Sequence, residues 1–383
     1  MRVGIFVVMV GRAAAGPETY EHCLVKEIAA LDRETEYHVF CLNPIAAKAF
    51  QIDQENVHFH VVRPSIRWIG MSAVLPVLLK RARLDLLHAT FTPPPICPVD
   101  YVFTMHGSVT FTHPEFYSPL IRLRLNHLIR RGLKKARLIL CVSRFVQDEI
   151  RELFKISQDR LVTVYHGVGS GFRPLRQDFV RETLRRRYGI ERPYILFTGK
   201  LHSNKNIVRL IEAFQRAREE AKQDIQLVLA GRKVWGSDGI DETIQRLRLS
   251  KDVLLVGHQS HEHLPTLYNG AMAFVFPSLW EGFGLPVMEA MACGAPVIAS
   301  NVACLPEVTG GAALLVDPLS TDAIAEGMYR LLTDEEKRLE LSRRGLARAR
   351  CFRWDRAARR TIDAYRQSLG LPGRSLADDP LDD

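Results

Sequence analysis

The feature that most constrains the fold is a series of short, continuously apolar segments separated by longer helical stretches. Strands buried on both faces of a parallel sheet have this composition, whereas half-exposed strands alternate apolar and polar residues. One set of segments fills the first half of the chain and a second set follows after a break. The expected strands are residues 3–10, 37–42, 57–62, 85–89, 101–105, 138–142 and 161–165, and then 194–199, 225–231, 253–257, 273–277, 296–300 and 312–316.

At 383 residues the chain is longer than one ordinary domain. The repeated pattern predicts an α/β protein with two doubly wound, Rossmann-like domains in series. Residues 166–177 hold three glycines and a proline without periodicity, so we expect a first domain over 1–172 and a second over 173–354. Two sheets facing a central cleft would bind ligands at the carboxyl ends of their strands. The segment 371–383, which is acidic overall, is expected to form a tail.

Composition excludes several classes of protein. No apolar run reaches the length of a membrane span. The apolar segment 3–10 could be the core of a signal peptide, but Arg12 interrupts it, so a strand followed by a loop is favoured. Seven widely spaced cysteines without a CxxC pair indicate reduced thiols, with no zinc or disulfide framework. These features favour a cytoplasmic protein.

The loop GKLHSNKN at 199–206 follows the first expected strand of the second domain and opens a helix near Asn206. Free N–H groups at a helix start, with the ammonium groups of Lys200 and Lys205, would attract an anion such as a diphosphate. The GxxxxGK[ST] pattern of a Walker A loop is absent. A solvated basic turn is the alternative interpretation.

The segment EGFGLP begins at Glu281 and follows another expected strand. Gly282 and Gly284 would let the backbone approach a ligand closely, and Pro286 suits the first turn of a helix. Glu289 has apolar neighbours, so we expect it to be buried, and a buried carboxylate needs a partner. The two adjacent hydroxyls of a ribose would be such a partner. A surface glutamate near the helix dipole is the alternative.

The segment EGFGLPVMEAMACGAPVIAS resembles the E-x7-E signature of retaining glycosyltransferases of family 4 (glycosyl transferases group 1), which have the GT-B fold. The resemblance covers nearly the whole chain. The segment at 352–366 resembles a terminal helix of the family that returns to the first domain, and we expect this helix at 355–370. The other matching segments are the loop at 199–206 with the helix after it, VSRFVQDEI (142–150), VYHGVGSGFRP (164–174), LPEVTGGAALLVDP (305–318) and FRWDRAARRTIDAYR (352–366).

The resemblance implies that the second domain binds the nucleotide sugar. Lys200 and Lys205 would neutralise the donor diphosphate, and Glu289 would hold the ribose. The family usually has arginine where this chain has Lys200, which keeps the charge but loses a bidentate geometry. Glu281 would bind the donor sugar and distal phosphate together with backbone groups. Those backbone groups belong to Phe283, Gly284 and Leu285.

The resemblance also implies roles in the first domain. His106, which follows an expected strand, would sit at the reacting sugar, and with Glu281 it is an expected catalytic residue. A lone histidine is otherwise more often structural. Gly16 would approach the donor phosphate from the loop at 11–20, although AAGPE lacks the GG pair that family members often have there.

Metal-dependent transferases of another fold use a D-x-D motif, which this chain lacks. Two lysines and a helix dipole could stabilise the departing diphosphate instead, so we expect no metal cofactor. We find no convincing carboxylate nucleophile. The family's usual account is front-face attack, in which the departing phosphate deprotonates the acceptor hydroxyl.

The expected activity is therefore transfer of a hexose from a nucleoside-diphosphate sugar to a saccharide or lipid-linked saccharide, in surface polysaccharide or lipopolysaccharide synthesis. A mannosyl- or rhamnosyltransferase with a GDP donor is favoured, and a UDP-glucose enzyme is the close alternative. A non-catalytic nucleotide-sugar-binding protein of the same fold is a further one. A sugar-nucleotide 2-epimerase would lack the E-x7-E block, and a nicotinamide dehydrogenase would need a GxGxxG spacing that GRAAAGPE does not have.

The net charge of +9 is concentrated in the first half of the chain, especially at 119–139, where seven basic residues occur without an acidic one. Apolar residues recur there at helical spacing, so an interfacial helix on an anionic membrane surface is one interpretation, and a core-packed helix with a solvated basic face is the other. The inner face of a membrane would suit a lipid-linked acceptor. Nucleic acid is disfavoured because aromatic residues are few in this segment. The apolar face would consist of Ile121, Leu125, Leu128, Ile129 and Leu133.

Overall fold

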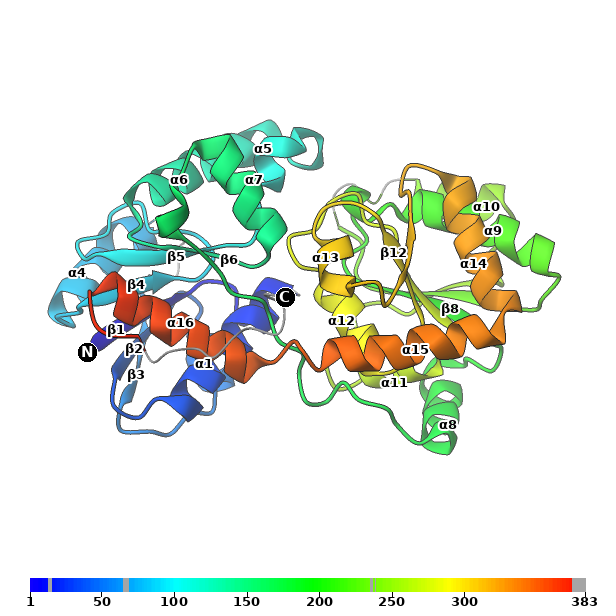
Figure 1. Cartoon of the computed structure of the whole chain (residues 1–383), viewed down its shortest axis with the longest axis horizontal. Helices are drawn as coiled ribbons and strands as arrows, with labels where there is room; N and C mark the ends of the chain where they lie inside the picture. The colour runs from blue at the N-terminus through cyan, green and yellow to red at the C-terminus, as the bar shows by residue number, and fades with distance from the viewer. Residues whose placement is uncertain (13–15, 65–68, 235–236, 238, 374–383) are drawn as a thin grey trace. The chain divides into compact units, whose positions relative to one another are not determined.

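The computed structural model describes residues 1–12, 16–64, 69–234, 237 and 239–373 (Figure 1). The chain divides into two compact units. Unit 1 consists of residues 1–167 and the segment from Arg353 onward, and unit 2 is Val168–Phe352. Most of the expected acidic tail, from residue 374, lies outside the described residues, as do residues 13–15 of the loop near Gly16.

Unit 1 is built on a parallel sheet that has seven strands in its described part, in the order β3-β2-β1-β4-β5-β6-β7. Every strand expected in the first half of the chain is present. β1 lies inside the sheet and is buried from its second residue onward, which confirms the strand predicted at 3–10. The strands are β1 (Arg2–Val7), β2 (Glu36–Cys41), β3 (Val57–Val61), β4 (Leu86–Ala89), β5 (Tyr101–Met105), β6 (Ile139–Cys141) and β7 (Leu161–Thr163).

Helices cover both faces of this sheet. In Figure 1, α6 and α7 lie on one side and α1 and α16 on the other. In the described part of unit 1 the α-helices are α1 (Gly16–Leu31), α2 (Pro44–Ala49), α4 (Leu75–Arg81), α5 (Val109–Thr112), α6 (Pro119–Lys135), α7 (Arg144–Phe154) and α16 (Trp354–Ser368).

Unit 2 repeats this architecture with a parallel sheet in the order β10-β9-β8-β11-β12-β13. The strand order reverses direction beside β8, as it does beside β1 in unit 1, so both sheets are doubly wound. The second set of expected strands is also confirmed. They are β8 (Tyr194–Thr198), β9 (Gln226–Ala230), β10 (Val253–Leu255), β11 (Ala273–Phe276), β12 (Val297–Ser300) and β13 (Leu314–Val316).

The helices of unit 2 also pack in two layers. α9 and α14 pack against each other, and α12 packs against α15 and α11. The helices are α8 (Gln177–Tyr188), α9 (Ile207–Ala221), α10 (Ile240–Arg246), α11 (Leu264–Gly270), α12 (Leu285–Ala292), α13 (Leu305–Thr309), α14 (Thr321–Thr333) and α15 (Glu335–Ala349). No helix in the described part of the chain is both long and apolar enough to cross a membrane.

The C-terminal helix α16 is part of unit 1 and packs against α1. A buried hydrogen-bond network fixes it to the sheet. Nδ1 of His88 on β4 lies 2.7 Å from the Tyr365 hydroxyl, and Nε2 of His88 lies 2.7 Å from Thr104 Oγ1. Thr104 Oγ1 also lies 2.8 Å from the Tyr20 hydroxyl on α1. Because buried polar groups are costly to leave unpaired, this network specifies where the last helix docks.

The predicted apolar face of α6 packs inward along most of its length, as the core-packed interpretation expected, and so does not form the membrane-facing surface of the other interpretation. Leu128 and Leu133 are buried, and Leu125 and Ile129 are partly buried, so this face packs against unit 1. Of the predicted set only Ile121 is exposed. The exposed apolar residues lie instead in the first turns, where Leu120 and Leu123 are each 70 % exposed.

Candidate functional site

The loop between β8 and α9 leads from the carboxyl end of a strand into the start of a helix, as the sequence predicted. It forms a short 3₁₀ turn over Ser203–Lys205, and α9 begins at Ile207. Asn206 caps the helix with φ of 62°, a left-handed conformation that asparagine tolerates better than most residues. Its side-chain amide donates to the carbonyls of Pro277 and Pro318, at 3.2 and 2.7 Å. Asn206 therefore joins three loops that follow strands of the same sheet.

Lys205 and Glu281, both predicted site residues, form an ion pair. Their loops are also joined through the backbone, because Leu279 N donates to Asn204 O at 2.8 Å. Both side chains are largely shielded, with 17 % of Lys205 and 13 % of Glu281 exposed, and Lys205 Nζ lies 5.3 Å from the centre of the Phe276 ring. The pair therefore places a positive and a negative group together at the carboxyl edge of the sheet.

The segment after Glu281 turns sharply into α12, as predicted. Gly284 has φ of 86°, and a Cβ there would lie 2.8 Å from Leu305 Cδ2, so this turn needs glycine. Gly284 is the N-cap residue of α12, and it has no side chain with which to cap the helix. Phe283 and Leu285 are buried, and Phe283 packs edge-on against Phe352. The buried side chains of Phe283 and Leu285 therefore hold the turn in place. A ligand would contact these two residues through their backbone groups.

Glu289 is buried within α12, with 5 % of the residue exposed. The Tyr268 hydroxyl on α11 donates to Oε2 at 3.0 Å, and Thr198 Oγ1 lies 2.6 Å from the same hydroxyl. Burial raises the pKa of Glu289 to about 7, and the bond from Tyr268 offsets only part of that rise. Among the described residues, Oε1 has no hydrogen-bond donor. The carboxylate is thus only half satisfied by the protein.

Lys200 lies in an extended segment between β8 and the 3₁₀ turn. This segment runs beside the loop after β9, because Gly199 N donates to Ala230 O and Leu201 N donates to Arg232 O. A Cβ on Gly231 would lie 1.7 Å from Gly199 O, so the close approach of these two loops needs glycine. The structure thus places Lys200 and Lys205 in one loop.

In unit 1, two acidic residues of α1 hold the loop that follows β1: Glu18 Oε1 accepts from Gly11 N at 2.7 Å, and Glu21 makes the other contacts. Oε1 of the buried Glu21 accepts from Val8 N at 2.9 Å, and Oε2 accepts from Met9 N at 2.6 Å and Val10 N at 3.1 Å. Burial raises the pKa of Glu21 to about 7 despite these bonds. Gly16, the predicted phosphate-facing residue, is the first residue of α1. Glu21 was not predicted from the sequence, where the only indication of its role is that an acidic residue stands early in this helix.

His106 directly follows β5 and is connected to Glu21 through Thr90. Nε2 of His106 lies 2.8 Å from Thr90 O, which can only accept, so Nε2 carries the proton. Thr90 Oγ1 donates in turn to Glu21 Oε1 at 2.7 Å. Burial lowers the pKa of His106 to about 4. The ring is therefore neutral at pH 7, and Nδ1 is a hydrogen-bond acceptor.

His106 also lies in an aromatic cluster. The ring centre is 4.8 Å from Tyr20, 5.3 Å from Phe91 and 5.7 Å from His166. His166 stacks on Trp354 of α16 at 5.5 Å. The C-terminal helix therefore supports the surroundings of His106 as well as the sheet.

Two doubly wound units in series are the architecture of the GT-B glycosyltransferase fold. Residues 14–170 match the family described as Glycosyltransferase Family 4, and residues 180–348 match Glycosyl transferases group 1. O-antigen chain mannosyltransferase B of Escherichia coli is 37 % identical over 266 residues, which are 69 % of this chain and 70 % of that protein. The chain therefore belongs to glycosyltransferase family 4 and is a hexosyltransferase.

One further relative and one solved structure are also similar to this chain. The serotype-specific mannosyltransferase WbdA of Escherichia coli is 32 % identical over 239 residues, which are 62 % of this chain but only 29 % of WbdA. The crystal structure of Anabaena Alr3699/HepE in complex with UDP-glucose superposes with a TM-score of 0.77 at 17 % identity, and covers 96 % of this chain and all of that one. At that identity the structural likeness establishes the fold alone.

The environment of Glu289 predicts a pH-dependent stability. Because its pKa of about 7 exceeds the ordinary 4.5, the folded protein holds this proton more tightly than the unfolded chain, and the free energy of unfolding falls as pH rises from 4.5 to 7. In Glu289→Gln the free energy of unfolding should fall by about 3 kcal/mol less over this pH range, because the variant has no carboxyl group at this position to titrate. Urea unfolding at a series of pH values measures it. The surface variant Glu326→Gln should keep the wild-type slope, and equal slopes for all three proteins would contradict this account of Glu289.

Proposed function

We propose that this protein is a retaining glycosyltransferase that moves mannose from GDP-mannose to a saccharide or lipid-linked saccharide acceptor in surface polysaccharide synthesis. The choice of sugar is supported by the names of the relatives, which include an O-antigen chain mannosyltransferase and a serotype-specific mannosyltransferase. A UDP-glucose donor is the alternative, and HepE, a structural neighbour, was crystallised with that compound.

The observation that carries the proposal is the half-satisfied carboxylate of Glu289. Tyr268 donates to one oxygen, and no donor among the described residues reaches the other. A buried carboxylate with one open acceptor favours a ligand that brings hydroxyl groups. The ribose of a nucleotide would donate to that oxygen and, by favouring the charged form, would lower the pKa of Glu289 towards its ordinary value.

The diphosphate would bind beside the ribose, between the start of α9 and the start of α12. Lys205 is held by Glu281 in the protein as it stands. A diphosphate carries more charge than one carboxylate, so it would draw Lys205 away and leave Glu281 to accept bonds from sugar hydroxyls. Lys200 and the first N–H groups of α12 would complete the neutralisation of the leaving group. This arrangement would work without a divalent cation.

His106 would position the donor sugar. With its Nε2 proton on Thr90 O, the neutral ring would accept a sugar hydroxyl at Nδ1. The low pKa of about 4 prevents the ring from becoming a cation beside the electron-poor anomeric carbon of the transition state. Retention would follow from front-face attack, with the acceptor hydroxyl passing its proton to the departing phosphate.

Turnover of GDP-mannose with saccharide acceptors tests the proposal. We expect transfer without added metal, in the presence of EDTA, to give a product that keeps the anomeric configuration of the donor, as NMR would report.

A hydrogen bond to a charged group contributes about 1.5–3 kcal/mol, so Glu289→Gln should raise the KM for the donor by about 10- to 100-fold. Lys205→Met should do the same, whereas Lys251→Met, an exposed lysine of the same unit, should not.

Three results would contradict the proposal. Folded Glu289→Gln with an unchanged donor KM would remove the assigned ribose contact. A product of inverted configuration would remove the front-face mechanism. Turnover of UDP-glucose with GDP-mannose inert would favour the alternative donor.

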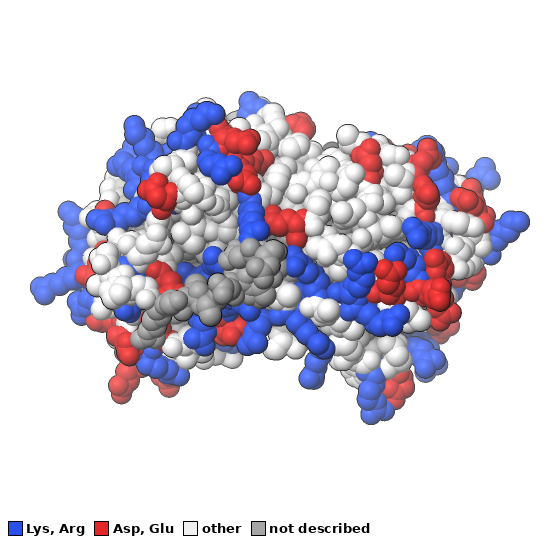
Figure 2. Space-filling model, viewed as in Figure 1, with Lys and Arg blue, Asp and Glu red and all other residues white. Residues whose placement is uncertain are grey.

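We also propose that the first turns of α6 contact an anionic membrane surface, where a lipid-linked acceptor would be presented. Leu120 and Leu123 are each 70 % exposed and Ile121 is 51 % exposed, and Arg122 and Arg124 alternate with them. Figure 2 shows basic side chains at the edge of unit 1 where α6 runs in Figure 1. Exposed apolar side chains among arginines fit the boundary between headgroups and acyl chains.

Vesicle flotation tests this contact. We expect the wild-type protein to float with vesicles that contain phosphatidylglycerol, less so at high salt, and not with pure phosphatidylcholine. The double variant Leu120→Gln/Leu123→Gln should lose most of the binding. A matched pair on unit 2, Leu319→Gln/Leu339→Gln, replaces leucines that are also exposed and should bind as the wild type does. Equal flotation of both double variants would contradict the assignment to α6.

A further inference from the structure

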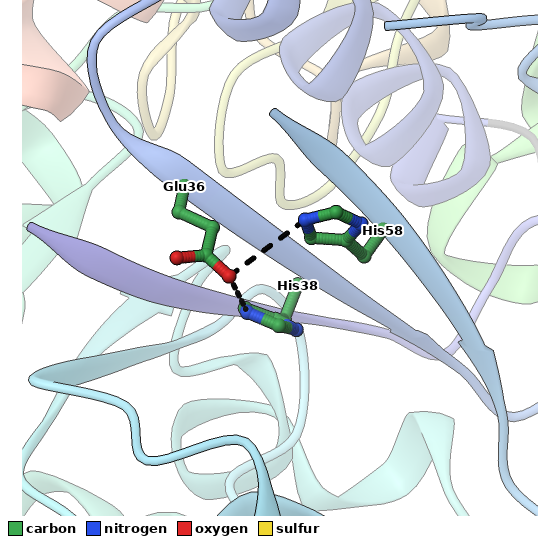
Figure 3. Close-up of side chains that lie close together, drawn as sticks. All are labelled: Glu36, His38 and His58. Carbon is green, nitrogen blue, oxygen red and sulfur yellow. Dashed lines mark hydrogen bonds and ion pairs between the residues drawn. The ribbon is translucent and has the colours of Figure 1, made fainter. Parts of the chain in front are cut away.

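A cluster of metal-ligating side chains lies on the β2–β3 edge of the unit 1 sheet (Figure 3). Glu36 and His38 are two residues apart on β2, so they share one face, and His58 on β3 is the register partner of His38. Glu36 Oε1 lies 3.0 Å from Nε2 of His38 and 3.7 Å from Nε2 of His58. The three ligand atoms all lie within 4.8 Å of one another.

These separations suit a transition-metal ion. A tetrahedral ion with bonds of 2.0–2.2 Å to imidazole nitrogen and carboxylate oxygen holds its ligand atoms about 3.4 Å apart. The Glu36 oxygen is close to that separation from both histidines. The His58 side chain is 44 % exposed, so it has room to rotate towards the other two, and the remaining coordination positions would face water.

A fourth residue orients one of the ligands. Nδ1 of His38 lies 2.9 Å from Nε2 of His60, which is two residues beyond His58 on the same face of β3. His60 is stacked on Phe40 at 4.8 Å, and this contact restricts its ring. A histidine that binds a metal through one nitrogen usually donates its other N–H to a nearby acceptor, which fixes the tautomer and the direction of the ligand. His60 can be that acceptor.

One contact opposes metal binding. Arg2 donates to both oxygens of Glu36, through Nε at 2.7 Å and through Nη2 at 3.1 Å. Its positive charge would repel a cation, although its side chain is 44 % exposed and can move into water. The arginine therefore weakens metal binding without blocking it, so removing its charge should strengthen binding.

We propose that Glu36, His38 and His58 bind a divalent transition-metal ion, Zn²⁺ above all, with His60 orienting His38. Glu36 is the first residue of β2, so the cluster lies towards the amino ends of the strands. The loop after β1 and His106 follow the carboxyl ends of strands of the same sheet. The bound ion would therefore link the edge strand to its neighbour and stabilise unit 1, without taking part in sugar transfer.

Calorimetric titration of EDTA-stripped protein with ZnCl₂ tests the site, and it does not depend on the proposed transferase activity. The wild type should bind one Zn²⁺ that His58→Ala loses or binds at least tenfold more weakly. His127→Ala, which removes another exposed histidine of unit 1, should bind as the wild type does. Mg²⁺ should give no binding here, because imidazole ligands favour transition metals.

Two further variants separate this site from incidental binding to histidine or cysteine elsewhere. His60→Ala should weaken binding by about 10- to 100-fold, as loss of an orienting partner does. Arg2→Gln should strengthen it, because the competing cation is gone. Substitution with Co²⁺ should give a spectrum without a thiolate charge-transfer band. Equal Zn²⁺ titrations for the wild type and His58→Ala, or a thiolate band that His58→Ala leaves unchanged, would overturn the proposal.

Discussion

A buried carboxylate must find hydrogen-bond donors, and each unit of this protein meets that constraint differently. Glu21 receives three backbone N–H groups and the Thr90 hydroxyl, so it is satisfied by the protein and serves to fix the loop after β1. Glu289 accepts a hydrogen bond from one phenol, and among the described residues no donor reaches its other oxygen. The carboxylate of Glu21 thus stabilises the shape of a loop, whereas the second oxygen of Glu289 is an acceptor to which a ligand could donate.

Around Glu289 the loops after several strands are tied into one surface at the carboxyl edge of the unit 2 sheet. Asn206 joins the loop after β8 to Pro277 and Pro318, and Lys205 joins it to Glu281. Gly231 permits close contact with Gly199. These connections tie Lys205, Glu281 and the start of α9 together, and in the function proposed above this preorganised arrangement would stabilise a leaving diphosphate.

The sequence was enough to predict the strands, both doubly wound sheets and the turn at Gly284, because these depend on local composition and on where a side chain is sterically excluded. It predicted that Glu289 is buried, but not that Tyr268 is its partner, since that pairing depends on how α11 and α12 pack. The role of Asn206 and the link from Glu21 through Thr90 to His106 were missed for the same reason. The His38 and His58 cluster escaped notice because its members come together only through the register of two strands. For α6, periodicity indicated which residues share a face but not which face is covered.

The central claim, that the carboxyl edge of unit 2 is a nucleoside-diphosphate site that needs no metal, is tested most directly by thermal shift. GDP, UDP, ADP and TDP would each be added with and without EDTA. A diphosphate present at 100 times its Kd stabilises the folded state by about 2.7 kcal/mol. The account predicts that one of the four, GDP first, raises the melting temperature clearly and equally with and without EDTA. No shift with any diphosphate, or a shift that EDTA abolishes, would contradict it.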